Sequence, residues 1–342
     1  MITKKIVHDV CVNWAQSNET GGGWWSLCTT PAGRIIAGSN NDTGIWYSDN
    51  NGETWSQSNK VDGNWYALCV IPTGRIIAEG SSGIWYSDDN GLNWTQSNKT
   101  DGVWYALCVT STGRIIAGSS RYRPNGNEVI GSAVGIWYSD NNGVTWTQSN
   151  KINGYWWSLC TTPTGRIIAG DTGGPGYSGA GIWYSDDNGV NWTQSNKKTG
   201  NEYDLCVTSA GRIIAASTNG IWYSDDNGLN WAQSNKTDGV WRALCVTQTG
   251  RIVATASNNI GVWYSDDNGV TWVRSNKTNG HWHGLCVTST GRIIIASIDT
   301  DGIWYSDQEI QSNYASKPLT GKQAKALVQQ CKAYVQSLKN GN

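Results

Sequence analysis

Short apolar segments rich in Trp, Tyr and Ile alternate with polar turns along most of the chain. A Gly-Ile-Trp-Tyr segment, an Asp-Asn-Gly turn and a Trp-Thr-Gln-Ser-Asn segment follow one another over residues 83–98. Gly and Asn tolerate the positive φ of tight turns, so this arrangement predicts a β-hairpin. The turn recurs with small changes at 48–55, 139–146, 185–192, 224–231 and 265–272.

A second motif, Gly-Arg-Ile, sets the period of the chain. Its successive arginines are separated by 41, 39, 52, 46, 39 and 41 residues, which gives seven units of roughly forty residues with two insertions. A unit of this length with four short strand signals is typical of a β-propeller blade. The arginines are Arg34, Arg75, Arg114, Arg166, Arg212, Arg251 and Arg292.

The unit at 103–150 shows four predicted strands, at 104–109, 114–118, 135–139 and 146–150. The chain opens with a lone fourth-strand segment at 14–18, and the seventh unit stops after its third strand, at 302–306. The N-terminal strand therefore completes the last blade and closes the ring, which leaves no open sheet edge. We predict an all-β, seven-bladed propeller of four-stranded antiparallel blades over residues 1–313.

The strand pattern ends after residue 313, so residues 314–342 form a separate tail. Thr320 and Gln323 offer a capping box for a C-terminal α-helix, which we expect to lie on the propeller. An oligomerisation or docking helix is the alternative. The predicted apolar face consists of Ala324, Leu327, Val328, Cys331, Val335 and Leu338.

The charge balance argues against two classes of partner. The 25 Lys and Arg residues nearly match the 26 Asp and Glu residues, so no basic footprint for nucleic acid or an anionic membrane appears. The apolar runs have strand length, and residues 1–9 lack the apolar core of a secretory signal. We expect a monomer, without membrane insertion, in the cytoplasm or on a phage particle, although an earlier removal of a signal peptide stays open.

Seven of the nine cysteines occupy one repeat position, directly after a Leu. They are too far apart to pair, so we expect small buried side chains with free thiols. Cys11 and Cys331 lie near the two ends, and whether they pair is open. The repeat cysteines are Cys28, Cys69, Cys108, Cys160, Cys206, Cys245 and Cys286.

The box Ser87-x-Asp89-x-Gly91-x-x-Trp94 resembles the Asp-box (BNR) repeat of sialidase-type β-propellers. Asn50 and Asn141 replace the Asp in two units, and residues 306–310 have lost the turn. The resemblance implies a structural turn away from the binding face, in a superfamily that includes glycosidases, lectin-like binders and assembly factors. Sialidases are six-bladed and use three non-repeated arginines, whereas most arginines here are repeated, so we do not expect sialidase activity.

Antiparallel order puts the Asp-boxes and the turns between strands 1 and 2 on one rim. Variation concentrates on the opposite rim, where both insertions, 119–134 and 171–180, connect strands 2 and 3. Strand 1, the innermost, carries an aromatic residue three positions before most cysteines, while the last three units bring charged or polar residues. The candidate ligand-binding residues are Trp25, Tyr66, Tyr105, Trp157, Glu202, Tyr203, Asp204, Arg242, His281 and His283.

Aromatic faces beside a few polar groups are the surfaces that sugars recognise. The leading hypothesis is a non-catalytic, lectin-like propeller that binds a glycan or cell-surface ligand, because near-identical units suit multivalent binding better than one active site. The alternatives are a glycoside hydrolase or lyase that uses Glu202 and Asp204 as a carboxylate pair, and a protein-assembly scaffold. No cofactor or metal is expected, since the three histidines lack ligand spacing and phosphate-loop and nucleophile-elbow motifs are missing.

Overall fold

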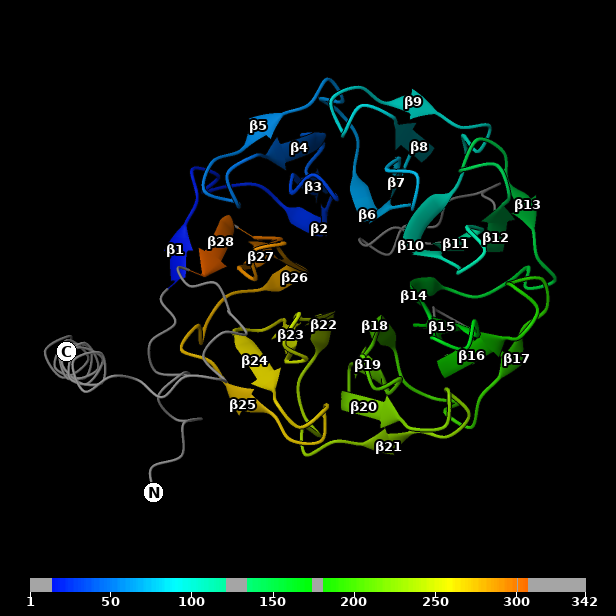
Figure 1. Ribbon diagram of the computed structural model, residues 1–342. Coiled ribbons are helices and arrows are strands. Elements are labelled where there is room, and N and C mark those ends of the chain that lie inside the picture. Colours follow the sequence, from blue (N-terminus) through cyan, green and yellow to red (C-terminus); the bar gives the residue numbers. More distant parts are fainter. Residues whose placement is uncertain (1–13, 121–133, 174–180, 300, 307–342) are drawn as a thin grey trace, which may run out of the picture.

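The computed structural model describes residues 14–120, 134–173, 181–299 and 301–306. In these residues, 28 strands form seven four-stranded antiparallel sheets. The sheets stand as blades around a central axis (Figure 1). The predicted all-β, seven-bladed architecture is therefore confirmed. The expected C-terminal helix and the boundary at residue 313 lie outside the described residues.

Each blade has the same order of strands from the axis outward. The inner strands are β2 (Trp24–Thr29), β6 (Trp65–Val70), β10 (Val103–Val109), β14 (Trp156–Thr161), β18 (Glu202–Val207), β22 (Trp241–Val246) and β26 (Trp282–Val287). The second strands are β3 (Ile35–Ser39), β7 (Ile76–Gly80), β11 (Ile115–Ser120), β15 (Ile167–Asp171), β19 (Ile213–Ser217), β23 (Ile252–Ala256) and β27 (Ile293–Ser297).

The outer half of each blade consists of one regular strand and one very short strand. The third strands are β4 (Ile45–Ser48), β8 (Gly83–Ser87), β12 (Gly135–Ser139), β16 (Gly181–Ser185), β20 (Gly220–Ser224), β24 (Val262–Ser265) and β28 (Ile303–Ser306). The outer strands are β5 (Ser56–Gln57), β9 (Thr95–Gln96), β13 (Thr147–Gln148), β17 (Thr193–Gln194), β21 (Ala232–Gln233), β25 (Val273–Arg274) and β1 (Trp14–Gln16).

One blade is built from segments at opposite ends of the described chain. Its sheet has the order β1-β28-β27-β26, with Trp14 opposite Ser306 and Gln16 opposite Trp304. The Trp14 indole Nε1 also donates a hydrogen bond of 3.1 Å to the Asn276 side chain in the preceding blade. The blade thus takes its outer strand from the N-terminal side of the chain.

The core lies between neighbouring blades rather than within a blade. All residues of the second strands are buried. The first Trp of each inner strand but β18 is also buried and fills the space between the sheets of two neighbouring blades. Gly38 shows how closely the blades approach, because an added Cβ would lie 2.9 Å from the Trp65 carbonyl oxygen of the next blade. Such contact explains why the second strands begin with β-branched residues and continue with mostly small ones, as in Ile35–Ser39.

The repeated box forms the predicted hairpin turn. Asp89 Oδ1 accepts hydrogen bonds from the Ser87 hydroxyl at 2.9 Å and from the Asn93 N–H at 2.8 Å. Asn90 adopts a φ of 62°, and the Trp94 indole donates to the Gly91 carbonyl at 3.2 Å. The box therefore satisfies its own backbone groups and fixes the Trp below the turn.

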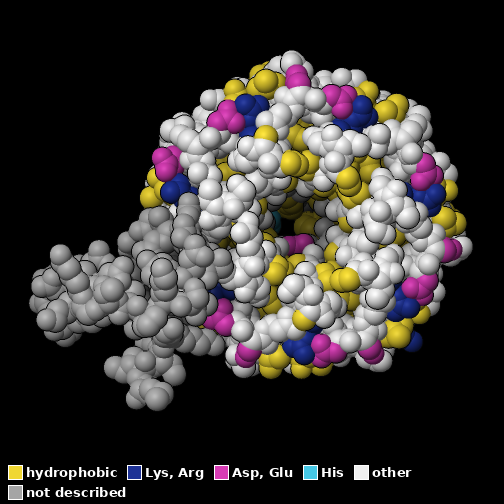
Figure 2. All heavy atoms as spheres, viewed as in Figure 1, with side chains coloured by type: hydrophobic (Ala, Val, Ile, Leu, Met, Phe, Trp, Pro, Cys, Tyr) yellow, Lys and Arg dark blue, Asp and Glu magenta, His cyan; other side chains and the backbone are white. Residues whose placement is uncertain are grey.

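Six of the repeated arginines donate a hydrogen bond to a backbone carbonyl of the next blade: Arg34, Arg75, Arg114, Arg166, Arg212 and Arg292. Arg75 donates two hydrogen bonds, of 2.6 and 2.8 Å, to the carboxylate of Asp88 in its own blade. Its Nη1 donates a third, of 2.9 Å, to the Asn142 carbonyl in the following blade. Paired basic and acidic side chains recur around the rim in Figure 2. Arginines engaged in this way are structural, as their repetition predicts.

Replacing Asp89 distinguishes the geometry of the box from its charge. Asn50 occupies the equivalent place in the first blade and accepts the Thr54 N–H at 2.9 Å. Asp89→Asn keeps the acceptor for the Asn93 N–H but loses the oxygen that accepts the Asn93 side-chain amide at 2.5 Å. We therefore expect Asp89→Asn to lower the free energy of unfolding less than Asp89→Ala, which should lower it by about 1 kcal/mol. Urea unfolding measures both variants, and equal losses would contradict this account of the box.

Candidate functional site

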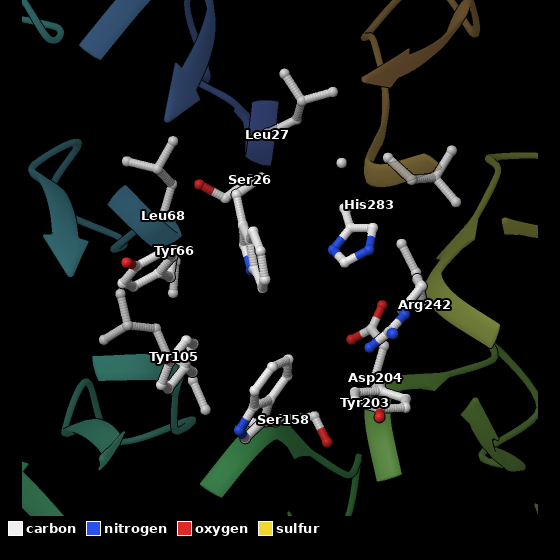
Figure 3. Close-up of a pocket in the computed structure, with 18 of the residues that line it drawn as sticks. Ser26, Leu27, Tyr66, Leu68, Tyr105, Ser158, Tyr203, Asp204, Arg242 and His283 are labelled. Atoms are coloured by element: carbon white, nitrogen blue, oxygen red, sulfur yellow. The ribbon is translucent and has the colours of Figure 1, made fainter. Parts of the chain in front are cut away.

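A cavity of about 180 Å³ lies on the axis of the ring, between the inner strands. It is lined by eight of the ten residues that the sequence analysis proposes for ligand binding (Figure 3). These are Trp25, Tyr66, Tyr105, Trp157, Tyr203, Asp204, Arg242 and His283. The β-bulges of the inner strands, such as that between Trp24 and Ser26, lie where these side chains turn from the blade toward the axis.

The aromatic residues form a packed wall on the first four blades. Tyr105 stacks on Trp157 with ring centroids 4.6 Å apart and on Tyr66 at 4.8 Å. Tyr66 and Tyr105 are only 6% and 4% exposed, so they contribute to the wall by packing against its other aromatic side chains. Trp25 contacts Tyr66 at 5.3 Å and His283 at 4.6 Å. Partly exposed Trp25 and Trp157 are the aromatic faces that a ligand can reach.

Arg242 and His283 face this wall from the sixth and seventh blades. The Arg242 guanidinium lies 3.9 Å from the centre of the Tyr203 ring, and its Nε donates to the Ser257 hydroxyl at 2.8 Å. His283 Nε2 is buried without a hydrogen-bond partner. Burial, together with the positive charge of Arg242, lowers the pKa of His283 well below its usual value. The imidazole is therefore neutral at pH 7.

Asp204 bridges two blades through backbone groups. Its Oδ1 accepts the Leu205 N–H at 2.8 Å, and its Oδ2 accepts the Leu244 N–H of the next blade at 2.6 Å. Burial raises the pKa of Asp204 to about 7, while the two N–H donors limit the rise. By charge and by the order of the blades, Arg242 could pair with Asp204 or with Glu202. Neither ion pair forms between these described residues.

Two of the expected residues lie outside the cavity. Glu202 occupies the position of an inner-strand Trp, is fully buried, and forms a 2.8 Å ion pair with Lys197. A buried carboxylate requires such a partner. Glu202 therefore does not line the axial cavity, and its part in ligand binding stays a prediction. His281 lies just before β26 and pairs with Asp299, with 2.7 Å between Nδ1 and Oδ2. It does not line the axial cavity.

The sequence analysis missed two buried polar features. Lys197 is not distinctive in sequence, because a lysine stands at the same place in most units. Glu79 had a visible signal, since Gly38, Gly118 and Gly170 occupy its place in other blades. Its side chain is fully buried with both carboxyl oxygens lacking hydrogen bonds, and burial raises its pKa well above the usual value. Glu79 is therefore a neutral acid between two blades and does not line the axial cavity.

A second hollow, of about 770 Å³, lies around the axis where the inner strands end. It is lined by turn residues such as Thr30, Pro31, Thr162 and Pro163, which belong to the Asp-box side. Figure 2 shows an opening at the centre of the ring. The axis is thus hollow at this end, whereas the aromatic wall narrows the other end.

The seven repeat cysteines are free, as predicted, and three of them, Cys108, Cys160 and Cys286, are buried. Cys11 and Cys331 lie outside the described residues. Within the described ranges, no group of three or more His, Cys, Asp or Glu side chains has an arrangement that could hold a metal ion. The same ranges contain no helix with the length and apolarity needed to cross a membrane.

Comparison with known proteins identifies the repeat. Residues 46–57 and 263–274 match the BNR/Asp-box repeat. The chain is a seven-bladed Asp-box β-propeller. No match was found among curated proteins. The Asp-box turns described above, including those whose Asp is replaced by Asn, thus form the structural turns that the resemblance implied.

Solved structures similar to this Asp-box propeller have diverse functions. A streptogramin B lyase has a TM-score of 0.66 at 12% identity, covering 86% of this chain and 97% of its own. The GH74 enzyme of Niastella koreensis has a TM-score of 0.66 at 17% identity, covering 87% and 54%. YCF48 bound to D1 peptide has a TM-score of 0.64 at 15% identity, covering 86% and 94%. At these identities the likeness establishes the fold alone.

Proposed function

We propose that this propeller is a non-catalytic binding protein that takes a carbohydrate or cell-surface ligand at its axial cavity. The carrying observation is the break in sevenfold symmetry there, where an aromatic wall on four blades faces Tyr203, Arg242 and His283 on three. Apolar C–H faces of a sugar stack on Trp25 and Trp157, while its hydroxyls need donors and acceptors such as those of the polar sector. We infer that the ligand enters from the rim formed by the loops from strand 4 to strand 1 and from strand 2 to strand 3, where the units differ most in sequence.

The hydrolase or lyase alternative loses its proposed pair of residues. Glycoside hydrolysis by two carboxyl groups requires both to flank one bond in the same cavity. Glu202 is paired with Lys197 between blades, and only Asp204 lines the cavity. The third alternative is a protein-assembly scaffold, and the YCF48 complex with a peptide is a structural precedent for a propeller that binds a polypeptide.

A glycan array beside an unbiased glycosidase screen tests the proposal. We expect binding without turnover, and loss of binding in both Asp204→Ala and Arg242→Ala if the variants keep their cooperative unfolding. Turnover would support the enzymatic alternative, and a negative result in both assays would favour the protein-assembly scaffold. Retained glycan binding in both variants would place the site elsewhere on the ring.

A further inference from the structure

We propose that the axial cavity takes a ligand that carries a carboxylate, and that Arg242 and His283 hold this anion. The inference rests on the proposed ligand site and adds the charge of the ligand. It follows from three observations: the Arg242 guanidinium forms no ion pair with a described residue, the His283 Nε2 has no hydrogen-bond partner among them, and the aromatic wall lies next to both.

Arg242 supplies the cation. Its Nε is engaged by Ser257 and its plane lies against Tyr203, which fixes the guanidinium at the edge of the cavity (Figure 3). No carboxylate of the described residues forms an ion pair with it. Burial lowers the pKa of Arg242, because the charge has lost water without gaining an anion. A ligand carboxylate at this place would restore the missing interaction and can bind a guanidinium through two parallel hydrogen bonds.

His283 supplies the second donor. Figure 3 shows its ring pointing into the cavity on the same side as Arg242. The buried Nε2 has no hydrogen-bond partner, and an unpaired buried polar atom is costly. An anion next to Arg242 would accept a hydrogen bond from this nitrogen. The two side chains come from neighbouring inner strands, β22 and β26, so one small group can contact both.

The remaining cavity wall fits the body of such a ligand. Trp25 packs edge-on against His283 at 4.6 Å, so a ring held at Arg242 would meet an aromatic side chain. Asp204 does not compete for the guanidinium, because both its oxygens accept backbone N–H groups of Leu205 and Leu244. Arg242 therefore stays available to an external carboxylate.

The pH dependence of binding has a defined sign. The charged or titratable groups around His283 are of two kinds. Arg242, Tyr203 and Asp204 line the same cavity, and His281 with its partner Asp299 lies just outside it. A bound anion raises the pKa of His283, so binding takes up a proton and strengthens as pH falls.

Isothermal titration calorimetry, which measures the dissociation constants of three probes for the full chain, tests the inference. The probes are D-glucuronate, benzoate and D-glucose, which separate a sugar acid from an aromatic acid and from a neutral sugar. We expect at least one acid to bind more tightly than glucose, by about tenfold or more. Arg242→Gln should remove this advantage, whereas Arg274→Gln on the outer strand β25 should keep it.

Lowering the pH from about 7.5 to about 5.5 should strengthen binding of the acid about threefold or more, and His283→Gln should reduce that gain.

The methyl ester of glucuronate keeps the test independent of any variant's folding. With the unmodified protein, the ester should bind as weakly as glucose because its charge is gone. Equal affinity for glucose, the ester and glucuronate would overturn the anion inference and leave the carbohydrate site standing. Failure of both acids to bind would also overturn it. Failure of every sugar on the glycan array would instead reject the proposed function itself.

Discussion

Deletion of residues 1–18 is expected to abolish cooperative unfolding and to cause aggregation. The deletion removes β1, which leaves β28 as an exposed edge with unpaired N–H and C=O groups from Ile303 to Ser306. It also removes Trp14, which packs between the last two blades against Val262 and Trp304. Truncation of a fully buried Trp costs about 3–5 kcal/mol, so the loss of the partly buried Trp14 adds a smaller penalty to that of the open sheet edge.

A shorter deletion provides the control for this experiment. Removing only residues 1–13 keeps β1 and its pairing with β28, so that variant should unfold cooperatively near the original melting temperature. Calorimetry and size-exclusion chromatography report both properties. A monomeric 1–18 deletion with an unchanged melting temperature would show that β1 does not secure the ring.

Replacement of Glu202 by Ala should destabilise the protein by about 3–5 kcal/mol, because it leaves the Lys197 ammonium buried without its carboxylate. Side-chain exposure is 5% for Lys197 and 0% for Glu202, so water cannot take over the lost interaction. Lys197 also donates to the Thr199 carbonyl at 2.8 Å and lies 4.2 Å from the Trp222 ring centre. Those contacts do not balance its charge.

Two further variants separate the missing charge from the missing volume. Lys197→Met combined with Glu202→Leu removes both charges and should recover much of the stability, since buried pairs often tolerate apolar replacement. Asp238→Ala breaks an ion pair with Lys236, but the aspartate is 78% exposed, so a small effect is expected. Urea unfolding compares all three. A loss for Glu202→Ala as small as that for Asp238→Ala would refute the buried-pair account.

Most of the fold could be predicted because each unit repeats its turn chemistry. The number of blades and the strand order follow from the Asn-Gly turns, the Gly-Arg-Ile motif, the lone fourth strand at one end and the three-strand unit at the other. Antiparallel order then places Trp25, Arg242 and His283 at one height on the inner strands. Local sequence thus determines which side chains face the axis.

The partners of the charged side chains could not be predicted from their positions on the strands. Glu202 and Asp204 are two residues apart on β18, yet Glu202 turns between blades to Lys197 and Asp204 accepts from Leu244. The bulge between these two residues shifts the alternation of side chains, which sequence spacing does not reveal. A charged residue in place of a repeated Trp or Gly, such as Glu202 or Glu79, indicates that the local contacts differ from those in the other blades. It does not indicate which partner the charged group has.

The pairing of β1 with β28 has a consequence for synthesis on the ribosome. About 290 residues separate the two strands, so at about 5–20 residues per second roughly 15–60 s pass before β28 follows β1 out of the ribosome. Six blades are each continuous in sequence and can form as they emerge, whereas the seventh must wait for its last three strands. During that interval the nascent chain presents Trp14 and an unpaired strand to its surroundings, and nearby ribosomes on the same message carry identical strands. Slow translation and crowded polysomes should therefore favour exchange of β1 between growing chains.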